Sequence, residues 1–348
     1  MSVLTVANAA AFVNKTAFNP IVTGILYLLR NYLLDHNKTS SSFLSNILTN
    51  EHTGSTLYWL ALFGVVKYFN SWLNYFALNN YTNLTEQFIP SKETALVTGG
   101  ASGIGALTVQ GLARAGLKKV IVWDIQELTY TPPPNVVFYK VDLTSGSEID
   151  AAAERVRSEI GHVTIVINNA GTGIGKTILG STERTVKLTF NVNAVAPFLV
   201  TKAFLPHMIK TNHGHVLTIA SLASFTTPAQ MVDYCASKAA ALVFSEGLSQ
   251  ELKHRYGAPG IRNSVVHPMW VKTPLTQVFN SLNHILANQL EPEDVANAVI
   301  KQVLLGKSAQ ICIPSSLGFS ALIRALPNWI QERIRDEQQD MIVVNKDF

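Results

Sequence analysis

The chain has 348 residues, of which 47% are hydrophobic and only 14% are charged, with a formal net charge of +4. Because ordinary globular proteins carry about 25% charged residues, this balance favours a membrane-associated protein. The mild charge, without a run of lysine and arginine, argues against nucleic acid as a partner. Cys235 and Cys312 are too few for a disulfide framework and lack metal-ligand spacing, so we expect no metal site and a reducing compartment for the catalytic part.

Residues 1–90 differ in composition from the rest. The short apolar run 6–13 has no basic region ahead of it, which argues against a cleaved secretory signal. Two longer helical candidates, 21–34 and 57–78, are apolar but interrupted by charged and amide side chains, whereas a membrane-spanning helix needs about 20 mainly apolar residues. The aromatic richness of 57–78 is typical of a membrane interface. We expect residues 1–90 to be a hydrophobic membrane anchor, either monotopic or a tilted span. The alternative is a pair of amphipathic helices packed on the catalytic domain or on a second subunit.

After residue 90 the pattern changes to short apolar runs separated by helical stretches. Such runs are typical of strands that are buried on both faces. The strand candidates are residues 94–98, 120–123, 136–141, 163–167, 215–219, 261–266 and 310–313. This alternation predicts an α/β fold, a doubly wound parallel seven-stranded sheet of the Rossmann type, with ligands at the carboxyl ends of the strands. We expect the catalytic domain to cover residues 91–315 and an apolar or amphipathic extension to cover 316–348.

A glycine-rich turn directly follows the first predicted strand. It reads Thr-Gly-Gly-Ala-Ser-Gly-Ile-Gly over residues 98–105 and opens a helix over 106–115. Glycines permit a tight turn and a close backbone approach, so amides at the helix N-terminus can hold a pyrophosphate. The alternative is a glycine turn without a ligand. The expected cofactor contacts in this turn are Gly99, Ser102, Gly103, Ile104 and Gly105.

Two aspartates follow the next two strands. Asp124 closes the second strand, where a carboxylate can bond the hydroxyls of an adenosine ribose and would repel a 2′-phosphate. No lysine or arginine in the glycine turn or just after Asp124 offsets that repulsion, so NAD is favoured over NADP. Asp142 follows the third strand and is expected either to bond the adenine or to serve as a turn or cap residue before Thr144 and Ser145.

Tyr234 and Lys238 stand four residues apart in Tyr-Cys-Ala-Ser-Lys, and Ser221 lies thirteen residues before the tyrosine. On a helix this spacing places the ammonium and the phenol on one face. A neighbouring cation lowers the pKa of a phenol from about 10, which suits proton exchange during carbonyl reduction or alcohol oxidation. Taken alone, the pair is equally typical of a solvated helix face.

Together these motifs resemble the classical short-chain dehydrogenases/reductases over residues 93–313. The matching segments are the glycine turn, Asn-Asn-Ala-Gly at 168–171, Asn193 within 191–194, Ser221, and Tyr234 with Lys238. Within the family the chain is most similar to membrane-anchored retinol and hydroxysteroid dehydrogenase-like members, which carry a hydrophobic N-terminal extension.

The resemblance implies a role for each matching residue. Tyr234 would be the general acid or base, and Ser221 would hold the substrate oxygen. Lys238 would lower the tyrosine pKa and bond the nicotinamide ribose, while Asn193 would hold a water that links the lysine to solvent. Asn169 would lie beside the cofactor and steady the sheet.

One segment departs from the family pattern, which usually has Pro-Gly after the sixth strand. This chain reads His-Pro-Met-Trp-Val-Lys-Thr over residues 267–273 and so lacks the glycine that easily adopts positive φ. The resemblance still places Val271 and Thr273 against the nicotinamide carboxamide. Trp270 is expected either to line the substrate pocket or to be a core aromatic.

The resemblance implies hydride transfer between NAD or NADP and a carbonyl or alcohol carbon. Residues 274–282 lie where the family has a mobile substrate lid, and 317–330 are also apolar, so we expect a lipophilic alcohol or ketone such as a retinoid, sterol or fatty alcohol. The expected location is the endoplasmic reticulum or lipid-droplet surface, with the catalytic domain facing the cytosol, and a homodimer is a further expectation. The alternatives are an NADPH-dependent ketone reductase and a catalytically silent membrane-associated scaffold with this fold.

Overall fold

The computed structural model describes residues 3–36, 43–82, 88–277, 289–339 and residue 342. The chain separates into two compact units, Met1–Leu78 and Asn79–Phe348. The three-part division at residues 90 and 315 stays a prediction.

The first unit consists of helices α1 (Val3–Lys15), α2 (Pro20–Asp35), α3 (Phe43–Thr49) and α4 (Glu51–Leu78). The Asn19 side chain caps α2 by accepting hydrogen bonds from the first-turn amides, and a proline at the first position completes the helix start. Glycines let α4 approach its neighbours closely. An ideal Cβ on Gly54 would lie 2.6 Å from Arg30 Cζ, and one on Gly64 would lie 2.9 Å from the Phe18 carbonyl oxygen. Aromatic rings add to this packing, since the ring centroids of Phe18 and Phe63 lie 4.8 Å apart and those of Tyr27 and Tyr58 lie 6.2 Å apart.

Among the described residues, one helical stretch is long and apolar enough to cross a membrane by length and composition, and it runs from Glu183 to Thr211. Half of its most apolar window is buried. It belongs to the second unit and carries Asn193, so its hydropathy is that of a core helix. The helix expected within the anchor, α4, does not meet the same criterion.

The second unit contains a seven-stranded sheet in which every pairing is parallel, in the order β3-β2-β1-β4-β5-β6-β7. The strands are β1 (Thr94–Thr98), β2 (Lys119–Asp124), β3 (Val136–Lys140), β4 (Ile165–Asn168), β5 (His215–Ile219), β6 (Arg262–Pro268) and β7 (Ala309–Ile313). The predicted doubly wound parallel sheet is confirmed. The chain order reverses between β1 and β4, the place where this fold forms a ligand crevice.

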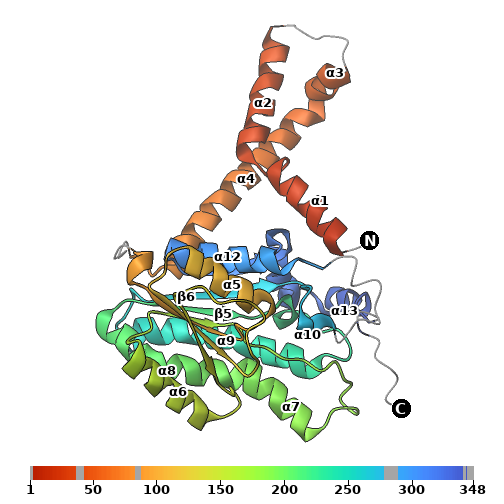
Figure 1. Cartoon of the computed structure of the whole chain (residues 1–348). Coiled ribbons are helices and arrows are strands. Elements are labelled where there is room, and N and C mark those ends of the chain that lie inside the picture. The colour runs from red at the N-terminus through yellow and green to blue at the C-terminus, as the bar shows by residue number, and fades with distance from the viewer. Residues whose placement is uncertain (1–2, 37–42, 83–87, 278–288, 340–341, 343–348) are drawn as a thin grey trace. The chain divides into compact units, whose positions relative to one another are not determined.

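Helices cover both faces of the sheet (Figure 1). One layer holds α5 (Gly103–Arg114) and α12 (Pro292–Leu305), and the other holds α6 (Gly146–Glu159), α7 (Glu183–Phe190), α8 (Ala196–Thr211) and α9 (Val232–His254). Strand β1 shows why the runs are apolar throughout: Leu96 belongs to the core beneath α8, whereas Ala95 and Val97 belong to the core beneath α5. Alternate side chains therefore fill both layers.

Shorter elements complete this unit. They are η1 (Pro90–Lys92), the π-helical turn η2 (Asn191–Val195), η3 (Leu222–Ser224), α10 (Pro274–Gln277), η4 (Ser315–Ala325) and α13 (Asn328–Asp336). Of the predicted lid over residues 274–282, only α10 is described, and residues 278–282 lie outside the described residues.

Candidate active site

The glycine turn joins β1 to α5 at the carboxyl edge of the sheet. Gly99 and Gly103 have φ values of +65° and +54°, which favour glycine. An ideal Cβ on Gly105 would lie 2.0 Å from the Gly99 carbonyl oxygen, so a side chain there would displace the turn. Ser102 precedes α5 in extended conformation and makes no side-chain cap, and Ile104 lies in its first turn and packs against the core. The first amides of α5 are therefore left for an anion such as a pyrophosphate.

Asn169 connects this turn to the end of β4. Its side-chain amide donates to the carbonyl oxygens of Thr98 and Gly99, each at 3.0 Å. The Thr98 hydroxyl accepts hydrogen bonds from the backbone amides of Asn169 and Ala170, both at 3.1 Å. The sequence reasoning missed Thr98 as a structural partner, although its place between strand and turn was the available signal. Asn169 thus ties the end of β4 to the glycine turn, and its place beside the cofactor stays a prediction.

Asp124 ends β2 and Asp142 lies shortly after β3, and their carboxylates are used differently. The Asp124 carboxylate accepts hydrogen bonds from the backbone amides of Ala101, at 2.9 Å, and Gln126, at 3.0 Å, and so tethers the glycine turn. Asp142 Oδ1 accepts from both the amide and the hydroxyl of Thr144, each at 2.8 Å. Asp142 therefore makes the turn contact with Thr144, one of the two alternatives that the sequence predicted.

Tyr234 and Lys238 lie on α9, with the ammonium nitrogen 5.8 Å from the centroid of the tyrosine ring. The Lys238 ammonium is buried and donates to the Ile219 carbonyl oxygen at 2.8 Å. Two glycines after β4 let the backbone pass close to both side chains. An ideal Cβ would lie 3.4 Å from Lys238 Nζ if placed on Gly171, and 2.9 Å from the Tyr234 ring if placed on Gly173. The backbone after β4 is therefore packed against both side chains.

Burial dominates the acid–base properties of this pair. It raises the pKa of Tyr234 to about 12, while the hydrogen bond with Ser221 acts in the opposite direction. Burial also lowers the pKa of Lys238 to about 8. The predicted lowering of the tyrosine pKa by the lysine is therefore not found in the chain by itself, because desolvation of the phenolate dominates and the lowering contribution comes from Ser221. Tyr234 is partly buried, and its spacing from Lys238 alone did not reveal this desolvation.

Asn193 lies in the π-helical turn η2, a local irregularity that often marks functional positions. It is buried, and its side chain pairs with the backbone of Thr172, accepting from the amide at 2.8 Å and donating to the carbonyl oxygen at 2.7 Å. Asn193 also donates to the Ser237 hydroxyl at 2.9 Å, which donates to the Tyr234 carbonyl oxygen at 2.7 Å. Ser237 thus joins Asn193 to the helix turn that carries the tyrosine and was not among the predicted site residues.

Ser221 ends the extension of β5 and caps η3, with its hydroxyl accepting from the Ala223 amide at 3.1 Å. Its side chain is also hydrogen-bonded to that of Tyr234. Tyr234 and Trp270 both pack against the buried side chains of Met231, Cys235 and Ile342. Trp270 therefore lines the same apolar cluster as the tyrosine.

The segment after β6 needs no glycine. Residues 267–273 are all described, and none of them has positive φ. Val271 makes a parallel bridge with Leu290, and its carbonyl oxygen accepts from the Thr276 hydroxyl at 2.7 Å. An ideal Cβ on Gly103 would lie 3.5 Å from Thr273 Cγ2, so Thr273 lies beside the glycine turn. The predicted contacts of Val271 and Thr273 with the nicotinamide carboxamide stay a prediction.

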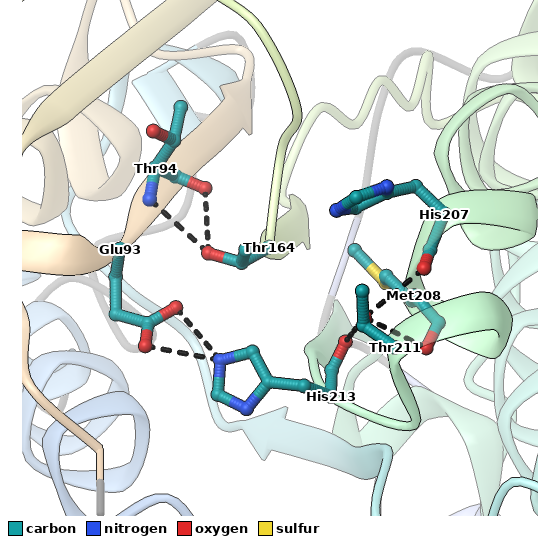
Figure 2. Close-up of polar contacts among 7 residues, drawn as sticks. All are labelled: Glu93, Thr94, Thr164, His207, Met208, Thr211 and His213. Carbon is teal, nitrogen blue, oxygen red and sulfur yellow. Dashed lines mark hydrogen bonds and ion pairs between the residues drawn. The ribbon is translucent and has the colours of Figure 1, made fainter.

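A second polar cluster lies at the opposite, amino edge of the sheet (Figure 2). The buried Glu93 carboxylate is bonded to His213 Nε2 at 3.0 and 3.1 Å, and the Thr164 hydroxyl bridges to the backbone of Thr94. A cavity of about 140 Å³ is lined by these side chains together with His215. Because ligands of this fold bind at the carboxyl ends of the strands, this cluster is separate from the predicted active site.

The residues of the carboxyl edge fit a nicotinamide dinucleotide. The uncapped helix start and the glycine φ values suit the pyrophosphate, and Asp124 lies where a ribose is expected. Among the described residues, no group of His, Cys, Asp or Glu side chains is arranged to hold a metal ion. The fold and this edge together define a doubly wound, dinucleotide-binding protein.

The chain belongs to the short chain dehydrogenase family, whose model matches residues 93–283. It is 38% identical to dehydrogenase RED2 of Cochliobolus heterostrophus, with 69% of this chain and 86% of that protein covered. It is 35% identical to mouse estradiol 17-beta-dehydrogenase 11 (72% and 86% covered) and 32% identical to human 17-beta-hydroxysteroid dehydrogenase 13 (76% and 92% covered). Thermoplasma acidophilum aldohexose dehydrogenase has the same fold, with a TM-score of 0.56 at 19% identity, and the match covers 65% of this chain and 94% of that structure. The chain is thus an oxidoreductase acting on CH–OH groups, in a family that binds NAD or NADP.

Proposed function

We propose that this protein transfers a hydride between NAD(H) and a lipophilic alcohol or ketone, with Tyr234 as the general acid or base. The observation that carries the proposal is the convergence of Tyr234, Lys238 and Asn193 at the edge that holds the glycine turn. The bound nicotinamide would accept or supply the hydride. The chain's own groups hold the substrate oxygen and move its proton.

Tyr234 exchanges the proton at the substrate oxygen, and the Ser221 hydroxyl orients that oxygen beside it. Lys238 supports the exchange, because an ammonium with a pKa of about 8 can release and regain a proton close to neutral pH. The Asn193 side chain is hydrogen-bonded to the backbone of Thr172, in the loop after β4. It would hold the water that passes the proton on to solvent.

The proposed substrate class is supported by the surroundings of Tyr234. Trp270, Met231, Cys235 and Ile342 make an apolar wall beside the phenol. Two of the related proteins carry names that specify estradiol or hydroxysteroid dehydrogenation. A sterol, retinoid or fatty alcohol fits this wall, since an apolar ligand gains binding energy by leaving water.

NAD is the proposed cofactor, because the Asp124 carboxylate would repel the 2′-phosphate of NADP. The carboxylate is held by the Ala101 and Gln126 amides, so it cannot easily turn away. A preference for NAD favours oxidation of the alcohol. A much lower KM for NADPH than for NADH would contradict this part of the proposal.

The N-terminal unit is proposed as a membrane anchor for the surface of the endoplasmic reticulum or a lipid droplet, with the catalytic unit in the cytosol. Its support is the exposure of large aromatic side chains on α4, including Trp59 at 62% and Trp72 at 55%. An apolar groove of about 710 Å³ also lies within this unit, lined by Phe18, Trp59 and Phe63. If the full chain stays in a high-speed supernatant without detergent, the anchor is disproved.

A homodimer is proposed through the outer faces of α8 and α9. Phe198 and Val243 are exposed there at 55% and 63%, and the ring of Phe198 packs on that of Phe244. An unpartnered apolar face of this kind is typical of a protein interface. Sedimentation of the detergent-solubilised chain measures its mass directly.

The central experiment assays the purified full chain in detergent with NAD and NADP against estradiol, retinol and a long-chain fatty alcohol. We expect NADH formation with at least one of them and a preference for NAD over NADP. Absence of turnover with every alcohol and with every matching ketone would refute the proposal.

A further inference from the structure

His267 is a fully buried histidine at the end of β6, where the chain departs from the usual family pattern. Its ring packs against Phe225 with a centroid separation of 4.7 Å. A buried imidazole loses its hydration, so its two nitrogens need partners within the protein. The identity of those partners indicates what His267 does.

The hydrogen-bond partners define the tautomer of His267. Nδ1 lies 3.1 Å from the Ser221 carbonyl oxygen, which only accepts, so Nδ1 carries the proton and donates it. Nε2 lies 3.4 Å from the amide nitrogen of Gln310 on β7, which donates to it. Burial lowers the pKa of His267 to about 4, with a smaller contribution in the same direction from Lys238, so the ring is neutral at physiological pH. Gln310 therefore stabilises the tautomer that holds Ser221.

The end of β6 contacts the Ser221 segment at three successive residues. The Val266 carbonyl oxygen accepts from the Ala220 amide at 2.8 Å, His267 binds the Ser221 carbonyl, and the Pro268 carbonyl accepts from the Ser221 hydroxyl at 3.4 Å. The first contact continues the sheet and the third is long. The Ser221 carbonyl oxygen thus accepts two hydrogen bonds, one from the Ser224 amide at 3.0 Å within the η3 turn and one from His267 Nδ1. The imidazole is the side chain that ties this carbonyl to β6, and the peptide that it holds carries the hydroxyl.

We propose that His267, supported by Gln310, is a positioning residue that orients the Ser221 hydroxyl toward the substrate oxygen. This inference rests on the proposed role of Ser221 in catalysis. A small displacement of a group that binds the reacting oxygen lowers turnover steeply without affecting the remote cofactor contacts. The expected signature is therefore a loss in kcat at unchanged cofactor affinity.

The matched variants are His267→Leu and His267→Asn, because Asn offers an amide N–H near the position of Nδ1 whereas Leu has a similar size without a donor. With an alcohol that the full chain oxidises, we expect H267L to lower kcat about 10- to 100-fold. H267N should recover most of that loss. The dissociation constant of NADH, from its fluorescence, and the melting temperature should be alike in the two variants.

A double-mutant cycle with Ser221→Ala separates positioning from a structural effect. In the S221A background, H267L should cause little further loss of kcat, since the hydroxyl that it positions is gone. An equal loss in both backgrounds, or no recovery by H267N, would overturn the inference while leaving the proposed function intact. An S221A variant with unchanged kcat would instead refute the role of Ser221 and with it the positioning role of His267.

Discussion

The two edges of the catalytic sheet carry similar polar side chains but use them differently. At the amino edge, Glu93 and His213 bond directly to each other (Figure 2). At the carboxyl edge, Lys238 donates to the end of β5, and Asn193 bonds both the loop after β4 and the Ser237 hydroxyl. The Glu93–His213 contact ties the chain before β1 to the chain before β5, whereas the contacts of Lys238 and Asn193 surround Tyr234. Variants at the carboxyl edge should therefore alter activity, and variants at the amino edge should alter stability.

The largest expected effect is that of Tyr234→Phe at the carboxyl edge. Loss of the proton donor should lower kcat about 10²- to 10⁴-fold, since general acid–base catalysis contributes that much. The NADH dissociation constant and the melting temperature should change little. Tyr256→Phe is the control, because Tyr256 is exposed and its hydroxyl bonds a surface glutamate, Glu251, at 2.8 Å. Equal activity of the two variants would disprove the role of Tyr234.

Gly105→Ala tests the glycine turn. The added methyl would lie 2.0 Å from the Gly99 carbonyl oxygen, so the turn must shift, and we expect kcat/KM for NAD to fall about 100-fold. Gly247→Ala on α9 is the control, because a Cβ there meets nothing within 4 Å. It should keep full activity and stabilise the protein by about 0.5–1 kcal/mol. Wild-type kinetics in G105A would show that the turn does not bind the cofactor.

Glu93→Gln tests the amino edge. The loss of a charge-assisted hydrogen bond to His213 should lower the free energy of unfolding by about 1.5–3 kcal/mol, as measured by urea denaturation. Because the pair lies far from Tyr234 along the strands, kcat should be unchanged. If kcat falls by more than the loss of folded protein accounts for, the amino edge also serves catalysis, and the difference between the two edges is disproved.

His215 at the start of β5 should make the fold sensitive to acid. Burial, and secondarily Arg262, lowers its pKa from 6.5 to about 3, so the unfolded chain binds the proton more readily than the folded chain. This contribution to stability is present above pH 6.5 and is lost as the pH falls toward about 3. His215→Gln can still bond the Ser264 hydroxyl, which His215 Nε2 contacts at 2.9 Å. Between pH 7 and pH 5, the free energy of unfolding should fall by about 2 kcal/mol less in the His215→Gln variant than in the wild type. Identical pH profiles for the two proteins would disprove the assignment.

The smallest effect concerns cofactor choice. Asp124→Asn keeps an oxygen acceptor for the Ala101 amide but removes the charge, so the preference for NAD over NADP should fall about tenfold, equivalent to about 1.4 kcal/mol. Glu127→Gln removes a charge from an exposed position three residues later and should leave the preference unchanged. An unchanged ratio in D124N would show that another group selects the cofactor.

The sequence predicted the sheet well because strands buried on both faces must be apolar throughout. The structure has Thr94–Thr98 and His215–Ile219 with the predicted bounds and shifts the other strands by one or a few residues. The glycine turn was equally predictable, because positive φ at Gly99 requires that residue type. Partners distant in sequence were not predictable, since no local pattern brings His267 to Ser221. The pKa of Tyr234 escaped prediction for the same reason, because burial is decided by the whole fold.

Deuterium transfer tests the central claim most directly. The full chain in detergent is incubated with NAD and an alcohol, such as estradiol or retinol, that carries deuterium on the carbinol carbon. Deuterium should appear in the reduced nicotinamide with the wild type and should fall at least about 100-fold in rate with Tyr234→Phe, at an unchanged NADH dissociation constant. Deuterium transfer at the wild-type rate in the tyrosine variant, or none in the wild type with any alcohol that binds, would contradict the account.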